Sequence, residues 1–247
     1  LLSTRTLDAL GLVAEVFAKW GVAMFLTPCF ASPITVGNMK TADPENALVQ
    51  QWWKDKVQNI SQTIPTFKGF LVKADSEGQP GPSTYGRNQS QGANMLAAAL
   101  STLYQRGNTN SNSSSSRRIS SNEHNAASSS SSSSSTTTSP TTGLVLWRAF
   151  EYGHSASGDR ATAAVEAFKP FDGEFQDNVV LQVKNGPIDF QVREPVSPLL
   201  ALGLRSQSGQ PLKLMLELQA TQVHGKISQI FTSTFVSISC ATALYRV

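Results

Sequence analysis

Helix-like and strand-like segments alternate along the chain, and this alternation restricts the fold more than any other feature. Segments with helical character lie at 6–19, 43–63, 91–105 and 159–168. Apolar, strand-like runs lie at 22–30, 67–73, 144–150, 179–183 and 212–218. Strands that alternate with helices predict a parallel sheet with right-handed crossovers, because parallel strands need long connections.

The expected fold class is therefore α/β, and we expect part of a (β/α)8 TIM barrel. The strands have the continuous apolar character of strands covered on both faces, and reactive side chains follow several of them. No G-x-G-x-x-G turn favours a Rossmann-type sheet. Five strands do not close an eight-stranded barrel, so the sequence predicts a partial barrel that lacks several strands on its N-terminal side. An open sheet is the alternative.

Residues 107–142 differ sharply in composition from the rest of the chain. They are almost wholly Ser, Thr, Asn and Gly, with eight consecutive serines at 128–135. Such a segment buries too little apolar surface to offset the entropy of ordering, so we expect a disordered insertion. It separates a first part of the predicted barrel, 1–106, from a second part, 143–222. The remaining residues, 223–247, form a divergent tail of unknown structure.

Charge and cysteine content exclude several classes of function. The formal net charge is only +3 at pH 7 and the basic residues are scattered, which argues against nucleic acids and membrane surfaces as partners. Two cysteines provide neither a disulfide framework nor a set of zinc ligands, and we expect no metal and no cofactor. No signal-peptide pattern precedes the first helix, and the sequence leaves the oligomeric state open.

Carboxylates lie at the ends of three predicted strands. Glu77 is in the turn after 67–73, Asp189 follows 179–183, and Glu217 stands between two leucines near the end of 212–218. A carboxylate in a buried strand is costly unless it is paired or used, so these residues indicate either catalysis or buried salt bridges. Asp75, in the same turn as Glu77, is the competing candidate for an acid.

Cations accompany these carboxylates. Lys73 and Lys184 lie at the ends of two of these strands, and Arg148 lies near the end of another, 144–150. Lysine and arginine are the natural counter-charges for a carboxylate or phosphate, so this end of the sheet could bind an anionic ligand.

Two long segments carry a resemblance to a known family: residues 67–82 (FKGFLVKADSEGQPGP) and 184–198 (KNGPIDFQVREPVSP). Shorter matching segments are 85–87, 92–96, 147–150 and 216–222. Together they resemble glycoside hydrolase family 67, the α-glucuronidases of xylan breakdown. The resemblance covers roughly 5–106 and 143–222.

The resemblance implies an inverting hydrolase that releases α-1,2-linked glucuronic acid, often 4-O-methylated, from xylo-oligosaccharides. Glu77 matches the family's general acid, and Asp189 and Glu217 match the pair that activates the attacking water. The implied substrates are oligosaccharides derived from glucuronoxylan, and the implied location is extracellular (secreted).

The same resemblance assigns substrate-binding roles to Lys73, Arg148, Lys184 and Trp147. One departure is Glu151, which stands where the family usually has an uncharged residue. Two other interpretations remain open: an inactive truncated remnant or carbohydrate-binding pseudoenzyme of the same family, and a structural protein whose Ser/Thr tract is glycosylated.

Overall fold

The computed structural model describes residues 4–64, 66–75, 80–109, 142–149, 158–159, 162–184, 196–217 and 235–237. The described strands form one six-stranded sheet. They are β1 (Ala23–Leu26), β2 (Phe67–Val72), β3 (Leu144–Ala149), β4 (Val179–Lys184), β5 (Lys213–Glu217) and β6 (Phe235–Ser237). Their order in the sheet is β5-β4-β3-β2-β1-β6, and all the pairings are parallel. The predicted α/β class is confirmed.

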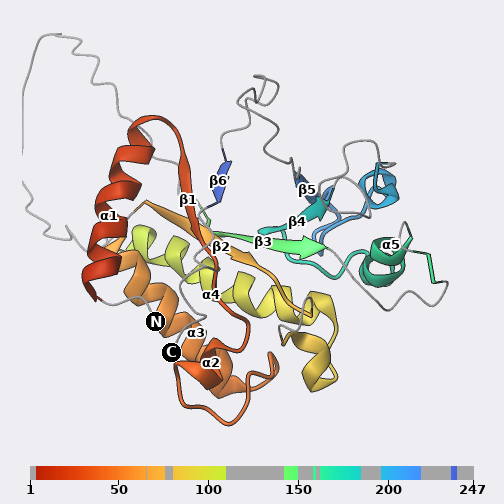
Figure 1. The fold of residues 1–247 in the computed structure, drawn as a ribbon, viewed down its shortest axis with the longest axis horizontal. Coiled ribbons are helices and arrows are strands. Elements are labelled where there is room, and N and C mark those ends of the chain that lie inside the picture. Colours follow the sequence, from red (N-terminus) through yellow and green to blue (C-terminus); the bar gives the residue numbers. More distant parts are fainter. Residues whose placement is uncertain are drawn as a thin grey trace, which may run out of the picture.

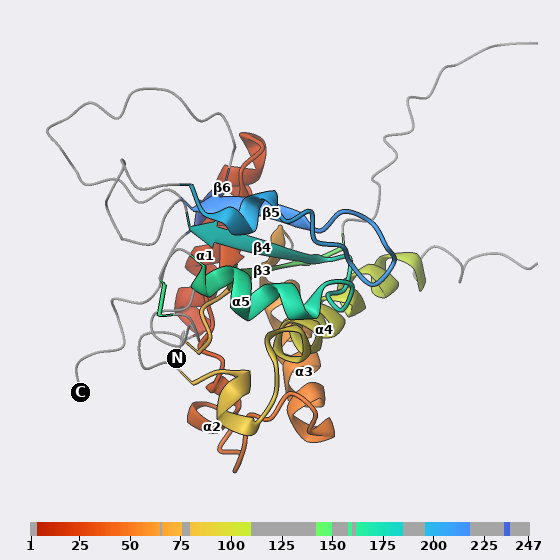
Figure 2. The same cartoon turned by 90° about the vertical axis from the view of Figure 1, so that its right-hand side faces the viewer.

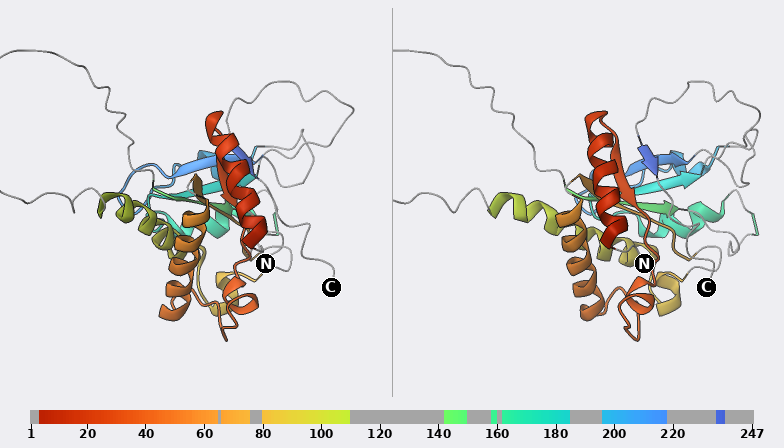
Figure 3. Two further views of the ribbon diagram at one scale, coloured as in Figure 1. Left: turned by 90° about the vertical axis from the view of Figure 1, so that its left-hand side faces the viewer. Right: turned by 60° about the vertical axis from the view of Figure 1, so that its left-hand side comes forward.

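The described helices cover one face of this sheet (Figures 1 and 2). They are α1 (Thr4–Lys19), α2 (Ser32–Thr35), α3 (Ala47–Thr63), α4 (Gln89–Thr109) and α5 (Ala163–Phe168), with 3-10 turns η1 (Pro82–Tyr85), η2 (Lys169–Phe171) and η3 (Pro198–Ala201). Figure 3 shows α1, α3 and α4 on the same side of the strands. From β1 to β5, strands that follow one another along the chain are also neighbours in the sheet.

From β1 to β5 this arrangement is singly wound. A doubly wound, Rossmann-type sheet reverses its strand order at a switch point and carries helices on both faces. Here β6 pairs with the side of β1 opposite to β2, so the strand order does reverse at β1, but the described helices share one face.

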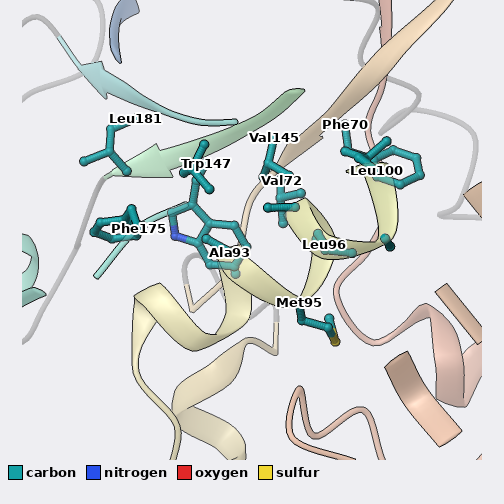
Figure 4. Packing of buried hydrophobic residues seen from close by; sticks show 14 of the residues in the cluster. Phe70, Val72, Ala93, Met95, Leu96, Leu100, Val145, Trp147, Phe175 and Leu181 are labelled. Atoms are coloured by element: carbon teal, nitrogen blue, oxygen red, sulfur yellow. The ribbon is translucent and has the colours of Figure 1, made fainter. Parts of the chain in front are cut away.

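The main core lies between the sheet and these helices. Phe70, Val72, Val145, Trp147 and Leu181 point from the strands toward α4, as Figure 4 shows. The helix contributes a stripe of buried side chains at helical spacing: Ala93, Met95, Leu96, Ala97, Ala99 and Leu100. The ring of Phe30 packs edge-on to that of Trp147, with centroids 6.2 Å apart. Burial of this stripe is what holds α4 against β2 and β3.

A second, smaller apolar cluster lies on the opposite face. It comprises Phe25, Leu146 and Val180, with Ala23, Leu71, Leu144 and Met215 packed around them. Because side chains alternate between the faces of a strand, Leu146 and Trp147 belong to different clusters although they are adjacent.

Several predicted boundaries need correction. The expected strand 22–30 is only Ala23–Leu26, and the expected helix 159–168 begins at Ala163. The α3 helix begins after Asn46, whose side chain accepts hydrogen bonds from the amides of Leu48 and Val49. Within the predicted insertion, α4 continues to Thr109, while residues 110–141 lie outside the described part of the chain. In the predicted tail, 235–237 pair with β1.

Strand β5 also differs from its expected environment. It is an edge strand among the described strands, and Leu216 is 39% exposed. Leu216, next to Glu217, is therefore less buried than the continuous apolar run predicts, while the burial of Glu217 itself stays a prediction.

One glycine is required by close strand approach. Gly69 in β2 has φ = 143°, and a Cβ there would overlap the carbonyl of Leu144 on β3. Only glycine permits both this backbone conformation and this contact.

No described helix is both long enough and apolar enough to cross a bilayer.

Candidate active site

Polar side chains replace apolar ones toward the carboxyl ends of the strands, on the face that carries the smaller cluster. Residues two positions apart in a strand lie on the same face. On this face a polar residue comes two positions after an apolar one: Lys73 after Leu71, Arg148 after Leu146, Gln182 after Val180, and Glu217 after Met215. The register places Arg148 beside Gln182 and Lys184 beside Glu217. These residues therefore lie toward the carboxyl ends of the strands on one face of the sheet. We call this group of residues the polar layer.

The predicted substrate-binding cations belong to this layer. Lys73 follows β2, Arg148 is in β3 and Lys184 ends β4, so they come from three adjacent strands. Lys184 is only 4% exposed, and the other two are half-buried. Each of the three has an interaction partner in the structure. A buried ammonium is costly without such compensation, so the partner of Lys184 accounts for its burial.

Two buried polar atoms near the carboxyl ends of the strands have no hydrogen-bond partner among the described residues. They are the amide oxygen Oε1 of Gln182 and the hydroxyl Oγ1 of Thr27, which follows β1. Gln182 lies between Arg148 and Lys184 on the same face. Sequence reasoning missed Gln182, because a glutamine within an apolar strand gives the same signal as a residue whose side chain is exposed to solvent.

The predicted catalytic carboxylates cannot be placed in the same way. Glu77 and Asp189 lie outside the described residues, and of Glu217 only the backbone position opposite Lys184 is described. Their roles remain predictions from the resemblance.

Asp75 occupies an anchoring position. Its carboxylate accepts three hydrogen bonds: from the backbone amide of Ser83 at 3.1 Å, from the hydroxyl of Ser83 at 2.5 Å, and from Nε2 of Gln89 at 3.1 Å. Its backbone has φ = 51°, an uncommon conformation for a residue other than glycine. This geometry favours a structural role for Asp75 over the role of catalytic acid.

Trp147 is placed away from the polar layer. Its side chain is 0% exposed and lies on the helix-covered face, where Nε1 donates to Oε1 of Gln89 at 2.9 Å. The predicted direct contact with substrate therefore has no support in this geometry. Strand alternation is the reason: the side chain next to Arg148 must point to the other face.

The start of α4 is built by local capping. The side chain of Asn88 accepts from the amide of Gln91 at 2.8 Å, and Gln91 Oε1 accepts from the amide of Asn88 at 3.0 Å. This reciprocal pair is a capping box, and the spacing N-x-x-Q in the sequence was the signal that could have placed the helix start. It also brings Gln89, which sequence reasoning did not single out, over Trp147.

A salt bridge joins this region to the start of α3. Nε and Nη2 of Arg87 donate to Oδ1 and Oδ2 of Asp43 at 3.0 and 3.1 Å. The hydrogen bond from Arg87 lowers the pKa of Asp43, and Asp43 raises the pKa of Arg87. The half-buried Arg87 thus supports the framework by joining the start of α4 to the start of α3.

No group of His, Cys, Asp and Glu side chains suited to a metal ion occurs within the described ranges. Cations from three adjacent strands lie at the same end of the sheet, which is an arrangement suited to an anionic ligand.

Comparison with known proteins agrees with this arrangement. The sequence model of the glycosyl hydrolase family 67 middle domain matches residues 1–106 and 120–233. A probable alpha-glucuronidase A of Neosartorya fischeri is 39% identical over 229 residues, covering 91% of this chain and 23% of the relative.

Two further relatives agree. The alpha-glucuronidase A of Emericella nidulans is 37% identical over 231 residues, covering 91% of this chain and 23% of the relative. The alpha-glucuronidase of Hypocrea jecorina is 40% identical over 205 residues, covering 81% and 20%. The chain spans less than a quarter of the length of these relatives. With most of its residues matched, the chain belongs to glycoside hydrolase family 67 and corresponds to the family's middle domain.

Proposed function

We propose that this chain forms the catalytic part of an inverting α-glucuronidase, which releases α-1,2-linked glucuronic acid or its 4-O-methyl ether from xylo-oligosaccharides. Membership of the family and the names of the relatives support the reaction class. The observation that carries the proposal is the polar layer, where Lys73, Arg148 and Lys184 come from adjacent strands at one edge of the sheet.

The cations fit a uronic acid substrate. Such a sugar differs from a neutral hexose by its carboxylate, and charge-assisted hydrogen bonds from lysine or arginine recognise that group in a low-dielectric site. Arg148 offers a planar fork suited to a carboxylate, whereas Lys73 and Lys184 act as point charges. Burial of Lys184 strengthens its interaction with a ligand that displaces water.

The acid and base are assigned by the resemblance. Glu77 protonates the oxygen of the leaving xylose, and Asp189 with Glu217 activates the attacking water. An inverting enzyme needs about 6.5–9.5 Å between acid and base so that water fits between them. Glu77 follows β2 and Asp189 follows β4, and strands two places apart are separated by about twice 4.8 Å, close to the upper end of that range.

We further propose that the sheet is part of a (β/α)8 barrel. In such barrels the helices surround the sheet, the inner face is filled by layers of side chains, and catalytic residues lie at the carboxyl ends of the strands. The singly wound order from β1 to β5, the helices on one face and the change from apolar to polar layers on the other support this arrangement.

The proposed partners are oligosaccharides derived from glucuronoxylan, and the proposed location is extracellular. No cofactor is required, because protonation of the leaving group and activation of water are both supplied by carboxyl groups.

The test compares two substrates that differ in their leaving group. We expect Glu77→Ala to abolish cleavage of aldouronic xylo-oligosaccharides while sparing a glucuronide with a very good leaving group, which needs no protonation. Asp189→Ala and Glu217→Ala should lose activity on both, because water activation is impaired. Equal losses for all three variants on both substrates would contradict these roles.

A second candidate is a carbohydrate-binding remnant without activity. The observation that favours it is the edge position of β5 among the described strands, with Leu216 exposed. Calorimetric titration with 4-O-methylglucuronic acid separates the two: binding without any release of glucuronic acid from aldouronic substrates identifies the remnant, whereas release identifies the enzyme.

A further inference from the structure

We propose that Asp75, Gln89 and Trp147 form a hydrogen-bonded chain that positions the acid-bearing turn relative to the strand of Arg148. We call these three residues the Asp75 relay. The proposal rests on the proposed function for its catalytic consequence, but its structural consequence can be tested without activity.

The relay connects the ends of two strands through the start of a helix. Trp147 in β3 donates from Nε1 to Gln89 at 2.9 Å, and Gln89, the first residue of α4, donates from Nε2 to Asp75 at 3.1 Å. Asp75 lies three residues beyond the end of β2. Trp147 and Gln89 are both buried, so water competes little for these bonds.

The direction of each bond is fixed by the chemistry of the tryptophan. An indole N–H can only donate, so the oxygen of the Gln89 amide must face it. The amide nitrogen of Gln89 then faces Asp75, which must present an acceptor. A side chain at position 75 that cannot accept leaves a buried donor unpaired, and this makes the relay specific rather than interchangeable.

Asp75 also holds the far side of the turn. Its two carboxylate oxygens bind the amide and hydroxyl of Ser83 in η1, eight residues along the chain. Gly81 lies so close that a Cβ there would overlap the backbone and carboxyl group of Asp75. Residues 75 and 80–83 are thereby held on both sides of 76–79, the segment that contains Glu77.

The relay therefore couples two groups of the proposed site. Trp147 is paired with Val72 across the sheet and directly precedes Arg148, the proposed ligand of the uronate. Fixing Trp147 to Asp75 restricts the movement of β3, which carries Arg148, relative to the residues that flank 76–79. A misplacement of about 1 Å in an active site can cost about 100-fold in rate.

The kinetic test uses two substitutions at Asp75. We expect Asp75→Ala to lower kcat on the natural substrate by about 10- to 100-fold with a smaller change in KM, because the acid is misplaced while the cations remain. Asp75→Asn should keep kcat within about threefold, since its oxygen can accept from Gln89 and the Ser83 amide while its NH₂ donates to the Ser83 hydroxyl. If Asp75 were itself the acid, Asp75→Asn would be as inactive as Asp75→Ala, and the relay would be refuted.

A substitution at Gln89 has a matched control. Gln89→Glu replaces the donor that faces Asp75 by a second carboxylate, and we expect the same loss of kcat. Gln51→Glu makes the identical change beside Asp55 on the exposed surface of α3, where Gln51 Nε2 now donates to Asp55 at 2.8 Å. It should leave kcat unchanged. Equal effects of both substitutions would contradict the proposal.

Hydrogen exchange provides the readout that does not depend on activity. In the unaltered chain, the indole N–H of Trp147 and the amide of Ser83 should exchange slowly. Asp75→Ala should accelerate exchange of the Ser83 amide by at least tenfold, whereas Asp172→Ala, which removes an exposed acceptor for the Arg205 amide, should not. Unchanged exchange in Asp75→Ala overturns the relay even if the chain is an active glucuronidase. Faster exchange in a chain without activity upholds the relay and contradicts the proposed function instead.

Discussion

Replacement of Gly92 by alanine tests the packing that brings α4 to the site. Gly92 lies in the first turn of α4, where its amide bonds to the carbonyl of Asn88 at 3.3 Å. A Cβ at this position would overlap the ring of Pro82 and lie 3.0 Å from Cη2 of Trp147. Pro82 and Trp147 are both buried, so neither can move aside easily.

Two effects of opposite sign determine the result. Helix propensity alone favours alanine over glycine by about 0.8–1 kcal/mol. Overpacking of a filled core costs about 1–3 kcal/mol, and two rigid neighbours place this site toward the upper end of that range. We therefore expect Gly92→Ala to lower the free energy of unfolding by about 1–2 kcal/mol, against the intrinsic preference of the helix.

Thermal unfolding followed by circular dichroism measures this effect. For a chain of this size, about 1 kcal/mol shifts Tm by about 2–4 °C, so Tm should fall by about 2–8 °C. Ala98→Gly, a half-buried position in the same helix, calibrates the propensity and should cost about 1 kcal/mol. A Tm that rises in Gly92→Ala would refute the close packing of η1, α4 and Trp147.

Two further predictions concern the framework around the site. Asn46→Ala removes the acceptor for the amides of Leu48 and Val49 at the start of α3 and should cost about 1 kcal/mol in urea unfolding, whereas Asn59→Ala, exposed within the same helix, should be neutral or slightly stabilising. Arg87 lowers the pKa of Asp43 below its ordinary value of 3.8, so this carboxylate stabilises the fold above that pH and loses its contribution as pH falls through the lower folded pKa. Asp43→Asn should therefore reduce Tm at pH 7 but approach the unaltered chain near pH 2, while Asp55→Asn should show no such convergence; a constant difference at all pH values would contradict the linkage.

The sheet was predictable because its signal is redundant. Each of β2, β3 and β4 is a run of apolar residues between helical patterns, and parallel pairing follows from the long connections alone. The side of the sheet to which a residue points follows from alternation only once the register is known. Trp147 and Arg148 are adjacent in sequence, yet the structure places one in the core and the other in the polar layer.

Tertiary partners explain what local reasoning missed. Asp43 and Asn46 are both plausible helix caps three residues apart, and the choice between them depends on Arg87, which pairs with Asp43 from 44 positions away in the sequence. Gln89 gave no signal because its partners, Asp75 and Trp147, come from two different strands. Asp75 was predicted as the weaker candidate for the acid, and its three accepted hydrogen bonds supply a physical reason for that preference.

The anomeric form of the first product tests the proposed chemistry most directly. Proton NMR can follow glucuronic acid released from an α-1,2-linked aldouronic oligosaccharide before mutarotation mixes the anomers. Inversion by water activated on the face opposite to the acid predicts β-glucuronic acid as the first product. Appearance of the α-anomer first would show retention and would contradict the assignment of Asp189 and Glu217 to water activation.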